Sequence, residues 1–321
     1  MPYFDAYVMI DWSGGNSRRC WKNDCIWIAR GARELREPET LSPASRTDAE
    51  SEIRKTIAAY VASSAGARRV LVCADFGYGF PRGFATLLPP SGHAPWRVVW
   101  EYLRQHVVDD MDGRDGGRPT NRSNRFEVAS AINGLAVTAG ASPGPFWCLP
   151  SANGHRHITQ GQPPKLFAWK GGSFGQKRIT DRRAGSDTPF RLFGTGSVGS
   201  QILTGIPRLA KLRFDPGLAP SSVVWPFESG WAPSSGQWLS ADQRIVHAEI
   251  YPSVQTPLPD PIKDCGQVRA MWQWARKLDA RDELLKEFSR PSGLKEEDNI
   301  AILDEEGWIL GCPVLQLPSS S

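Results

Sequence analysis

Apolar and polar positions divide the chain into short strands and longer helices, most clearly near its two ends. Apolar runs that end at turn residues are typical of buried strands, and apolar residues repeated every three or four positions are typical of helices. We therefore expect strands at 6–12, 25–30, 69–75 and 244–251, with a weakly marked strand within 31–42. Helices are expected at 47–63, 96–109, 124–137, 200–209, 264–278 and about 280–289.

The order of these elements indicates the fold class. A hairpin of strands precedes a helix, 47–63, for which Thr47 and Glu50 predict a capping box. A further strand follows, and a strand and helix come late in the chain. A strand hairpin followed by a helical crossover is the ribonuclease-H arrangement, whereas a doubly wound fold alternates strand and helix from the start. We predict an α/β fold with a ribonuclease-H-like mixed sheet flanked by helices.

Residues 82–243 are rich in Gly, Pro and Trp and predict a large insertion between the fourth and fifth core strands. The core then comprises 1–81 and 244–311, in a single domain spanning 1–321. The whole chain holds 13 Trp residues in 321. These rings either pack irregular segments onto the core or form a stacking surface for bases. Four of them lie in Gly- and Pro-rich sequence: Trp96, Trp147, Trp225 and Trp231.

Acidic residues recur at or near the ends of the expected strands. Asp11 and Asp75 directly follow apolar runs, Glu249 lies within the late strand, and Asp264 begins the helix after it. A buried carboxylate needs a counter-charge or hydrogen bonds. If the first and fourth strands are parallel neighbours, Asp11 and Asp75 lie side by side and repel each other unless a cation lies between them.

This pattern predicts a site for Mg²⁺ or Mn²⁺, which carboxylates and water bind well. We expect all four acids to be metal ligands and catalytic residues. Each acid has a plainer explanation as a helix cap or an ion pair, and Glu249 in particular shares a strand face with His247. Two other acids, Asp279 and Asp282, are rivals to Asp264 as the acid on the helix.

Basic residues form two clusters in the middle of the chain, although 38 basic and 34 acidic residues give a net charge of only +4. Such clusters are either solvated loops or a phosphate-binding surface. Arg122 and Arg125, at the start of an expected helix, are the candidates for contacting substrate phosphate. The clusters are Arg114, Arg118, Arg122 and Arg125, and Lys177, Arg178, Arg182 and Arg183.

A glycine-rich segment, residues 194–199, matches the GxGxxG pattern and precedes the helix expected at 200–209. We consider three interpretations: a structural turn, a phosphate-binding loop and a dinucleotide site with Asp215 on the ribose. The segment preceding it is a poor strand, which disfavours the dinucleotide site. In the phosphate-binding interpretation the contacts come from Gly194, Gly196, Ser197 and Gly199.

The cysteines and the hydropathy pattern indicate the compartment. No apolar run approaches the length of a membrane helix, and the N-terminus begins with a strand pattern rather than a signal peptide. We therefore expect a cytoplasmic protein with no membrane partner and with free thiols. Cys20 and Cys25 have the spacing of half a zinc site, but no second pair follows.

Seven motifs resemble those of a bacterial family of unknown function described as predicted nucleases with a ribonuclease-H-like fold. The resemblance covers most of the chain and implies that fold, with a carboxylate site at Asp11, Asp75 and Glu249. Related chains tend to carry an acidic pair at the start of the late helix, where this chain has Lys263 and Asp264. The motifs are MIDWSG (9–14), ADFGYGFP (74–81), NRFEVA (124–129), GSVGSQ (196–201), VWPFE (224–228), AEIYPS (248–253) and EGWILG (306–311).

We expect a metal-dependent phosphodiesterase or nuclease that acts on nucleic acid. Two metal ions in a carboxylate site activate water and stabilise the leaving oxygen, so no side-chain nucleophile is required. Two alternatives stay open. One is a non-catalytic module that binds nucleic acid or protein through the Trp-rich insertion, and the other is an ATP-dependent phosphotransferase. The sequence leaves the substrate, its strandedness and the oligomeric state undetermined.

Overall fold

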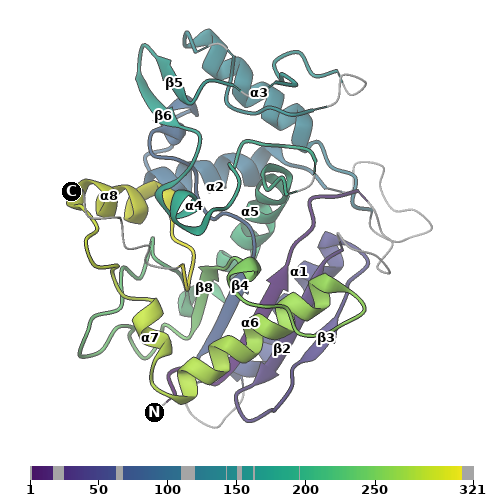
Figure 1. Cartoon of the computed structure of the whole chain (residues 1–321), viewed down its shortest axis with the longest axis vertical. Coiled ribbons are helices and arrows are strands. Elements are labelled where there is room, and N and C mark those ends of the chain that lie inside the picture. Colours follow the sequence, from purple (N-terminus) through teal and green to yellow (C-terminus); the bar gives the residue numbers. More distant parts are fainter. Residues whose placement is uncertain are drawn as a thin grey trace.

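The computed structural model has an α/β fold built on a six-stranded mixed sheet with helices on both faces (Figure 1). The sheet contains β1 (Ala6–Asp11), β2 (Trp27–Ala32), β3 (Glu39–Leu41), β4 (Val70–Ala74), β7 (Ser222–Val224) and β8 (Ile245–Glu249). The structure describes residues 2–16, 25–62, 68–109, 120–141, 143–149, 154–161, 163–194 and 196–312.

The strand order is β3-β2-β1-β4-β8-β7. β2 runs antiparallel to its two neighbours, β1 and β3, whereas β1, β4, β8 and β7 are mutually parallel. In the parallel register Ile10 is opposite Ala74, and Ala74 is opposite Glu249. The carboxyl ends of β1, β4 and β8 therefore meet at one edge of the sheet, where α/β proteins usually bind ligands.

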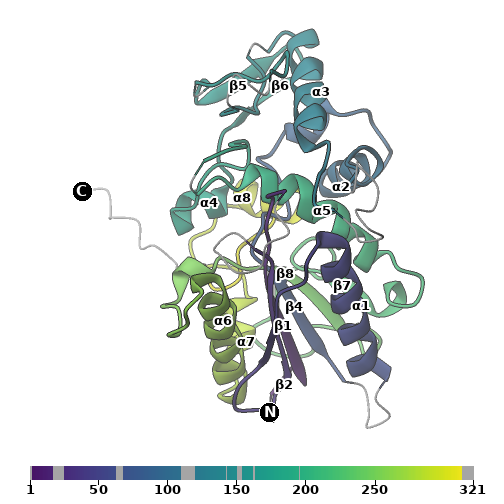
Figure 2. The same ribbon diagram turned by 90° about the vertical axis from the view of Figure 1, so that its right-hand side faces the viewer.

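Helices cover both faces of the sheet, with α1 (Arg46–Ala62) and α6 (Lys263–Ala280) on opposite sides (Figure 2). Alternate strand residues supply the two cores, because successive strand side chains point to opposite faces. Val8 and Ile10 belong to the core shared with α1 and α5 (Gly199–Arg213). Tyr7 and Met9 belong to the core shared with α6. Two further helices, α7 (Leu284–Glu287) and α8 (Glu296–Ala301), follow α6.

Residues 82–243 supply most of the layer above the sheet edge, but they also contribute β7, which pairs with β8 in the main sheet. Figure 2 shows α5 crossing above the strand ends, with α3 and the β5–β6 hairpin farther away. The sequence analysis did not anticipate β7 or this hairpin. The remaining elements of this segment are α2 (Pro95–His106), α3 (Arg125–Thr138), α4 (Ile179–Ala184), β5 (Leu166–Trp169) and β6 (Gly172–Gly175).

The expected strands and the helices at 47–63 and 264–278 are confirmed, with boundary shifts of one to two residues. The helix expected at about 280–289 is present only as the four residues of α7. The capping box is wrong, because Ser45, not Thr47, caps α1. The Ser45 hydroxyl accepts from the Asp48 backbone N–H at 3.0 Å and donates to the Asp48 carboxylate at 2.7 Å. Trp96 and Trp225 are buried and Trp147 and Trp231 partly buried, so these rings mainly pack the interior. Within the described ranges, no helix has the length and hydropathy to cross a bilayer.

Candidate functional site

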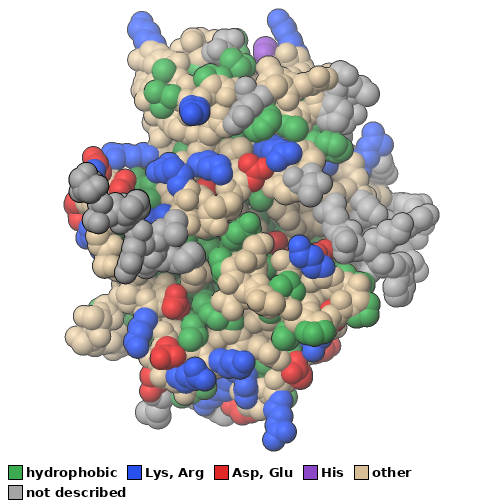
Figure 3. Space-filling view, in the orientation of Figure 1, with side chains coloured by type: hydrophobic (Ala, Val, Ile, Leu, Met, Phe, Trp, Pro, Cys, Tyr) green, Lys and Arg blue, Asp and Glu red, His purple; other side chains and the backbone are tan. Residues whose placement is uncertain are grey.

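A cavity of about 670 Å³ opens at the carboxyl ends of β1 and β4. The loop after β1, the start of α5, the turn after β8 and the first turns of α6 form its walls. Three of the four predicted acids line it: Asp11, Asp75 and Asp264. Figure 3 shows this face of the molecule hollowed at mid-height, beneath a row of Lys and Arg side chains.

The strand register explains why Asp11 and Asp75 lie together. The pair after Ile10 and Ala74 in the parallel ladder is Asp11 and Asp75, and the Asp75 N–H donates to the Ile10 carbonyl at 3.1 Å. By the alternation of side chains, both acids point to the α6 face of the sheet. Asp264 lies in the first turn of α6 on that same face. Three segments remote in sequence thus direct carboxylates to one cavity.

The electrostatics of Asp75 reflect this crowding. Burial raises the pKa of its carboxyl to about 8, the Trp12 backbone N–H opposes the shift, and the negative charge of Asp264 adds to it. The Trp12 N–H donates to Asp75 Oδ1 at 2.6 Å. A buried acid with a raised pKa and a second acid nearby is typical of functional sites. Binding of a proton or a cation would relieve the repulsion between these acids.

The carboxylates share a cavity but do not surround a single point. Within the residues that the structure describes, no three Asp, Glu, His or Cys side chains are grouped closely enough to form a complete metal site. Three acids therefore line the cavity without forming a closed set of metal ligands among the described residues. An ion bound here would need water in its coordination shell.

Glu249 differs from the other three acids, because it forms an ion pair with Arg178 and does not line the cavity. Arg178 Nη2 and Nη1 contact the two Glu249 oxygens at 2.6 and 2.7 Å, and the Tyr78 N–H donates at 2.9 Å. Glu249 is opposite Ala74, so the register points its side chain away from the α6 face that Asp75 shares. The His247 pairing considered above is absent as well, since His247 Nε2 lies 3.3 Å from Ser222 Oγ.

The two rivals to Asp264 lie elsewhere. Asp279 is buried near the end of α6, where it accepts hydrogen bonds from the N–H groups of Tyr3 and Phe4 and from the Tyr7 hydroxyl. Asp282 is exposed, just beyond the C-terminus of α6. Asp264 is therefore the acid that α6 contributes to the cavity.

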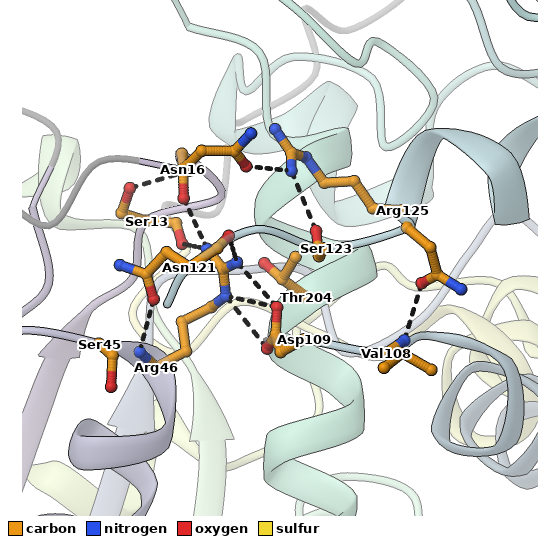
Figure 4. Close-up of polar contacts among 12 residues, drawn as sticks. Ser13, Asn16, Ser45, Arg46, Val108, Asp109, Asn121, Ser123, Arg125 and Thr204 are labelled. Atoms are coloured by element: carbon orange, nitrogen blue, oxygen red, sulfur yellow. Dashed lines mark hydrogen bonds and ion pairs between the residues drawn. The ribbon is translucent and has the colours of Figure 1, made fainter. Parts of the chain in front are cut away.

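Of the two candidate arginines for phosphate, Arg125 lines the cavity and Arg122 is exposed outside it. Arg125 is 6% exposed. Its guanidinium donates to Asn16 Oδ1 at 2.7 Å and to Ser123 Oγ at 3.0 Å (Figure 4). It also donates to Ser200 Oγ at 3.2 Å. These hydrogen bonds to neutral oxygens hold the cation at the cavity wall.

The glycine-rich segment also contributes to the cavity, through Gly194, Gly196 and Ser197. Gly194 and Gly196 have φ values of 97° and 78°, which favour glycine. Gly199 begins α5 and does not line the cavity. A Cβ on Gly199 would lie 2.6 Å from the Arg191 carbonyl oxygen, so this glycine permits close backbone packing.

Arg46, which was not predicted as a site residue, is fully buried and organises the loop after β1. Its guanidinium pairs with Asp109 at 2.8 Å and donates to the carbonyls of Ser13 at 3.2 Å and Gly15 at 2.7 Å (Figure 4). Gly14 packs against the start of α5, where a Cβ would lie 2.6 Å from the Ser200 carbonyl carbon. No local pattern around Arg46 identified this role, because its partners are distant in sequence.

The second basic cluster is mainly structural. Arg178 is buried and binds Asp181 and Glu249, and Lys177 donates to the Ser186 carbonyl at 2.6 Å. Among the described residues, Cys73, Cys148 and Cys265 have free thiols. Some residues named in the sequence analysis lie outside the described residues, namely Cys20, Arg114, Arg118 and the Thr at position 195 of the glycine-rich segment.

Comparison with known proteins found no matching family model, no matching curated protein and no matching solved structure.

Proposed function

We propose that this protein is a metal-dependent phosphodiesterase or nuclease that acts on nucleic acid at the cavity above β1 and β4. The observation that carries the proposal is that Asp11, Asp75 and Asp264, from three remote segments, line one cavity together with Arg125. Carboxylates that bind divalent cations and an arginine that binds phosphate are the groups that phosphodiester hydrolysis requires.

We also propose that the core is ribonuclease-H-like. The order β3-β2-β1-β4-β8, with β2 alone antiparallel to β1 and a helix between β3 and β4, supports this interpretation. A resemblance of fold does not by itself establish an activity. The site therefore carries the functional argument, and the topology explains why these acids meet.

The donor set fits Mg²⁺ or Mn²⁺. Its ligand atoms are carboxylate oxygens, and the raised pKa of Asp75 indicates a place where added positive charge is favourable. Mg²⁺ usually binds one or two carboxylates and keeps several waters. Three acids line the 670 Å³ cavity, so one or two of them can contact an ion that keeps several waters. Asp11, Asp75 and Asp264 would hold the ion, which when bound lowers the pKa of water and stabilises the leaving oxygen.

The other cavity residues have separate roles in the proposal. Arg125 binds a non-bridging phosphate oxygen, and its hydrogen bonds to Asn16 and Ser200 fix its position before substrate arrives. Gly194, Gly196 and Ser197 allow a phosphate group to approach the backbone closely. Glu249 has no part in metal binding here, since Arg178 already contacts its two oxygens.

The test is cleavage of single- and double-stranded DNA and RNA, with and without Mg²⁺ or Mn²⁺. We expect metal-dependent cleavage by the wild type and its loss in Asp11→Asn. Asp282→Asn is the matched control, because Asp282 is exposed and its φ of 57° is one that Asn tolerates. Equal activity in wild type and Asp11→Asn would eliminate the site. Tight binding with no cleavage would favour the non-catalytic module.

A further inference from the structure

We infer that the cavity takes a single strand of nucleic acid and that a base stacks on Phe193. This inference rests on the proposed function for its claim that the bound strand is a substrate. Three observations carry it: the size of the cavity, the exposure of Phe193 on its wall, and the position of Arg125 and the acids in the same space.

The size of the cavity limits what reaches the acids. A volume of about 670 Å³ is that of a site for one ligand of modest size. Specific duplex binding instead uses roughly 1,000–2,500 Å² of protein surface against an open groove. Here the start of α5, Gly194, Gly196 and the turn after β8 all line the cavity. A short stretch of one strand fits such a space, and a duplex does not.

Phe193 is unusual among the aromatic residues of this chain. Its neighbour Phe190 is fully buried in a cluster with Phe80, Phe84 and Phe146, whereas Phe193 is 51% exposed. Among the described residues it is the only aromatic one in the set of exposed large hydrophobic side chains. It also lines the cavity that contains the acids. Phe193 and Arg125 line the same cavity. Exposed aromatic rings combined with basic side chains are the usual arrangement for binding a single strand.

Stacking on Phe193 and the phosphate contact at Arg125 give complementary recognition. Each base presents a π face, so stacking tolerates any sequence, and a strand is then held by its backbone charge. Residues 192–194 connect the ring directly to the glycine-rich segment that enters α5. The base and its neighbouring phosphate would therefore contact adjacent parts of one cavity wall. A base that is paired inside a duplex cannot stack on Phe193 in this way.

The experiment measures binding and cleavage separately on the full chain. Fluorescence anisotropy, in EDTA at fixed salt, gives the Kd of a labelled single-stranded oligonucleotide and of the same sequence as a duplex. We expect at least tenfold tighter binding of the single strand. Phe193→Ala should raise the single-strand Kd roughly 5- to 150-fold, which corresponds to the loss of one stacked base. Phe193→Tyr should restore binding, and Leu166→Ala, which removes an exposed apolar side chain of β5, should not change it.

Equal Kd values for single strand and duplex, or an unchanged Kd in Phe193→Ala, would overturn the inference. Mn²⁺-dependent cleavage of the same oligonucleotides then separates it from the proposed function. Cleavage that is abolished by Asp75→Asn but prefers duplex would keep the phosphodiesterase and overturn the single-strand site. Binding of single strand that depends on Phe193, with no cleavage under any metal, would keep the site and overturn the phosphodiesterase.

Discussion

Glu249 and Asp75 lie on neighbouring strands at the same edge of the sheet, yet they have opposite surroundings. Both follow or end an apolar run, and burial raises the pKa of both carboxyls. Glu249 is held by Arg178 at 2.6 and 2.7 Å, whereas Asp75 faces a cavity and a second acid, Asp264. A one-residue difference in register separates an acid that is paired with an arginine from one that lines the cavity.

The two surroundings have different energetic consequences. Breaking a buried ion pair leaves an uncompensated charge and is strongly destabilising, so Glu249 and Arg178 should matter for folding. Where the folded-state pKa of an acid lies above its unfolded-state pKa, the stability falls as the pH rises above the unfolded-state value, and the folded-state pKa of Asp75 is about 8. Asp75 should therefore matter for activity and oppose folding at neutral and alkaline pH.

Asp75→Asn should abolish activity while preserving the fold. Loss of a metal ligand removes several kcal/mol of transition-state stabilisation, so the proposed cleavage should fall about 10³-fold or more. The folded-state pKa of about 8 lies above the unfolded value, so wild-type stability falls as the pH rises from about 4 to 8. In metal-free buffer the variant should lack that part of the pH dependence and melt at a higher temperature at pH 8. A variant that cleaves normally, or melts lower, contradicts this assignment.

Arg178→Met should destabilise the protein by about 3–5 kcal/mol, because Glu249 and Asp181 both lose their buried partner. Urea unfolding measures this change. Arg182→Met is the matched control, since Arg182 is exposed on α4, the helix for which Arg178 is the N-cap residue, and should change stability by less than about 0.5 kcal/mol. Equal effects of the two substitutions would show that the Arg178 pair is not a structural element.

His247 lies two residues before Glu249 on β8 and is fully buried. Its titration gives a second test of how burial on this strand affects stability. Burial, together with the charge of Arg213, lowers its pKa to about 3. The unfolded state binds a proton below about pH 6.5 and the folded state does not, so stability should fall as the pH drops. Between pH 7 and pH 5 this residue should account for about 2 kcal/mol. His247→Gln should remove that component, and unchanged pH dependence in urea titrations would contradict the assignment.

Asp264→Asn should lower the pKa of Asp75, because it removes one of the charges that raise it. NMR titration of ¹³C-labelled aspartate carboxyls in EDTA measures the shift. Asp282→Asn, at the other end of α6, should leave the Asp75 titration unchanged. An Asp75 signal that does not respond to Asp264→Asn would mean that these acids do not share one electrostatic site.

The sequence supplied much of the fold, because periodicity and strand length directly report burial. β1, β4, β8, α1 and α6 were predicted near their observed bounds. The three-residue β7 and the β5–β6 hairpin were missed, since such short strands carry almost no periodic pattern. The cap of α1 was placed at Thr47 instead of Ser45, because both positions offer a hydroxyl followed three residues later by an acid.

The site was predicted less completely, for a physical reason. Asp11 and Asp75 follow from the strand order, and their shared register brings them together. Glu249 was predicted to join them because it too lies at the end of a strand. The alternation of side chains along β8, however, points Glu249 to the other face of the sheet. Arg178 looked like part of a surface cluster, since its partners Asp181 and Glu249 are identified only by tertiary packing. The ion pair of Arg46 with Asp109 could not be predicted either, because these residues meet only through tertiary packing.

The most direct test is anomalous diffraction from crystals grown with Mn²⁺. We predict a peak in the cavity bounded by the carboxylates of Asp11, Asp75 and Asp264, and no peak at Glu249. No peak in this cavity at saturating Mn²⁺, or an ion bound instead by Glu249 with Arg178 displaced, would contradict the account.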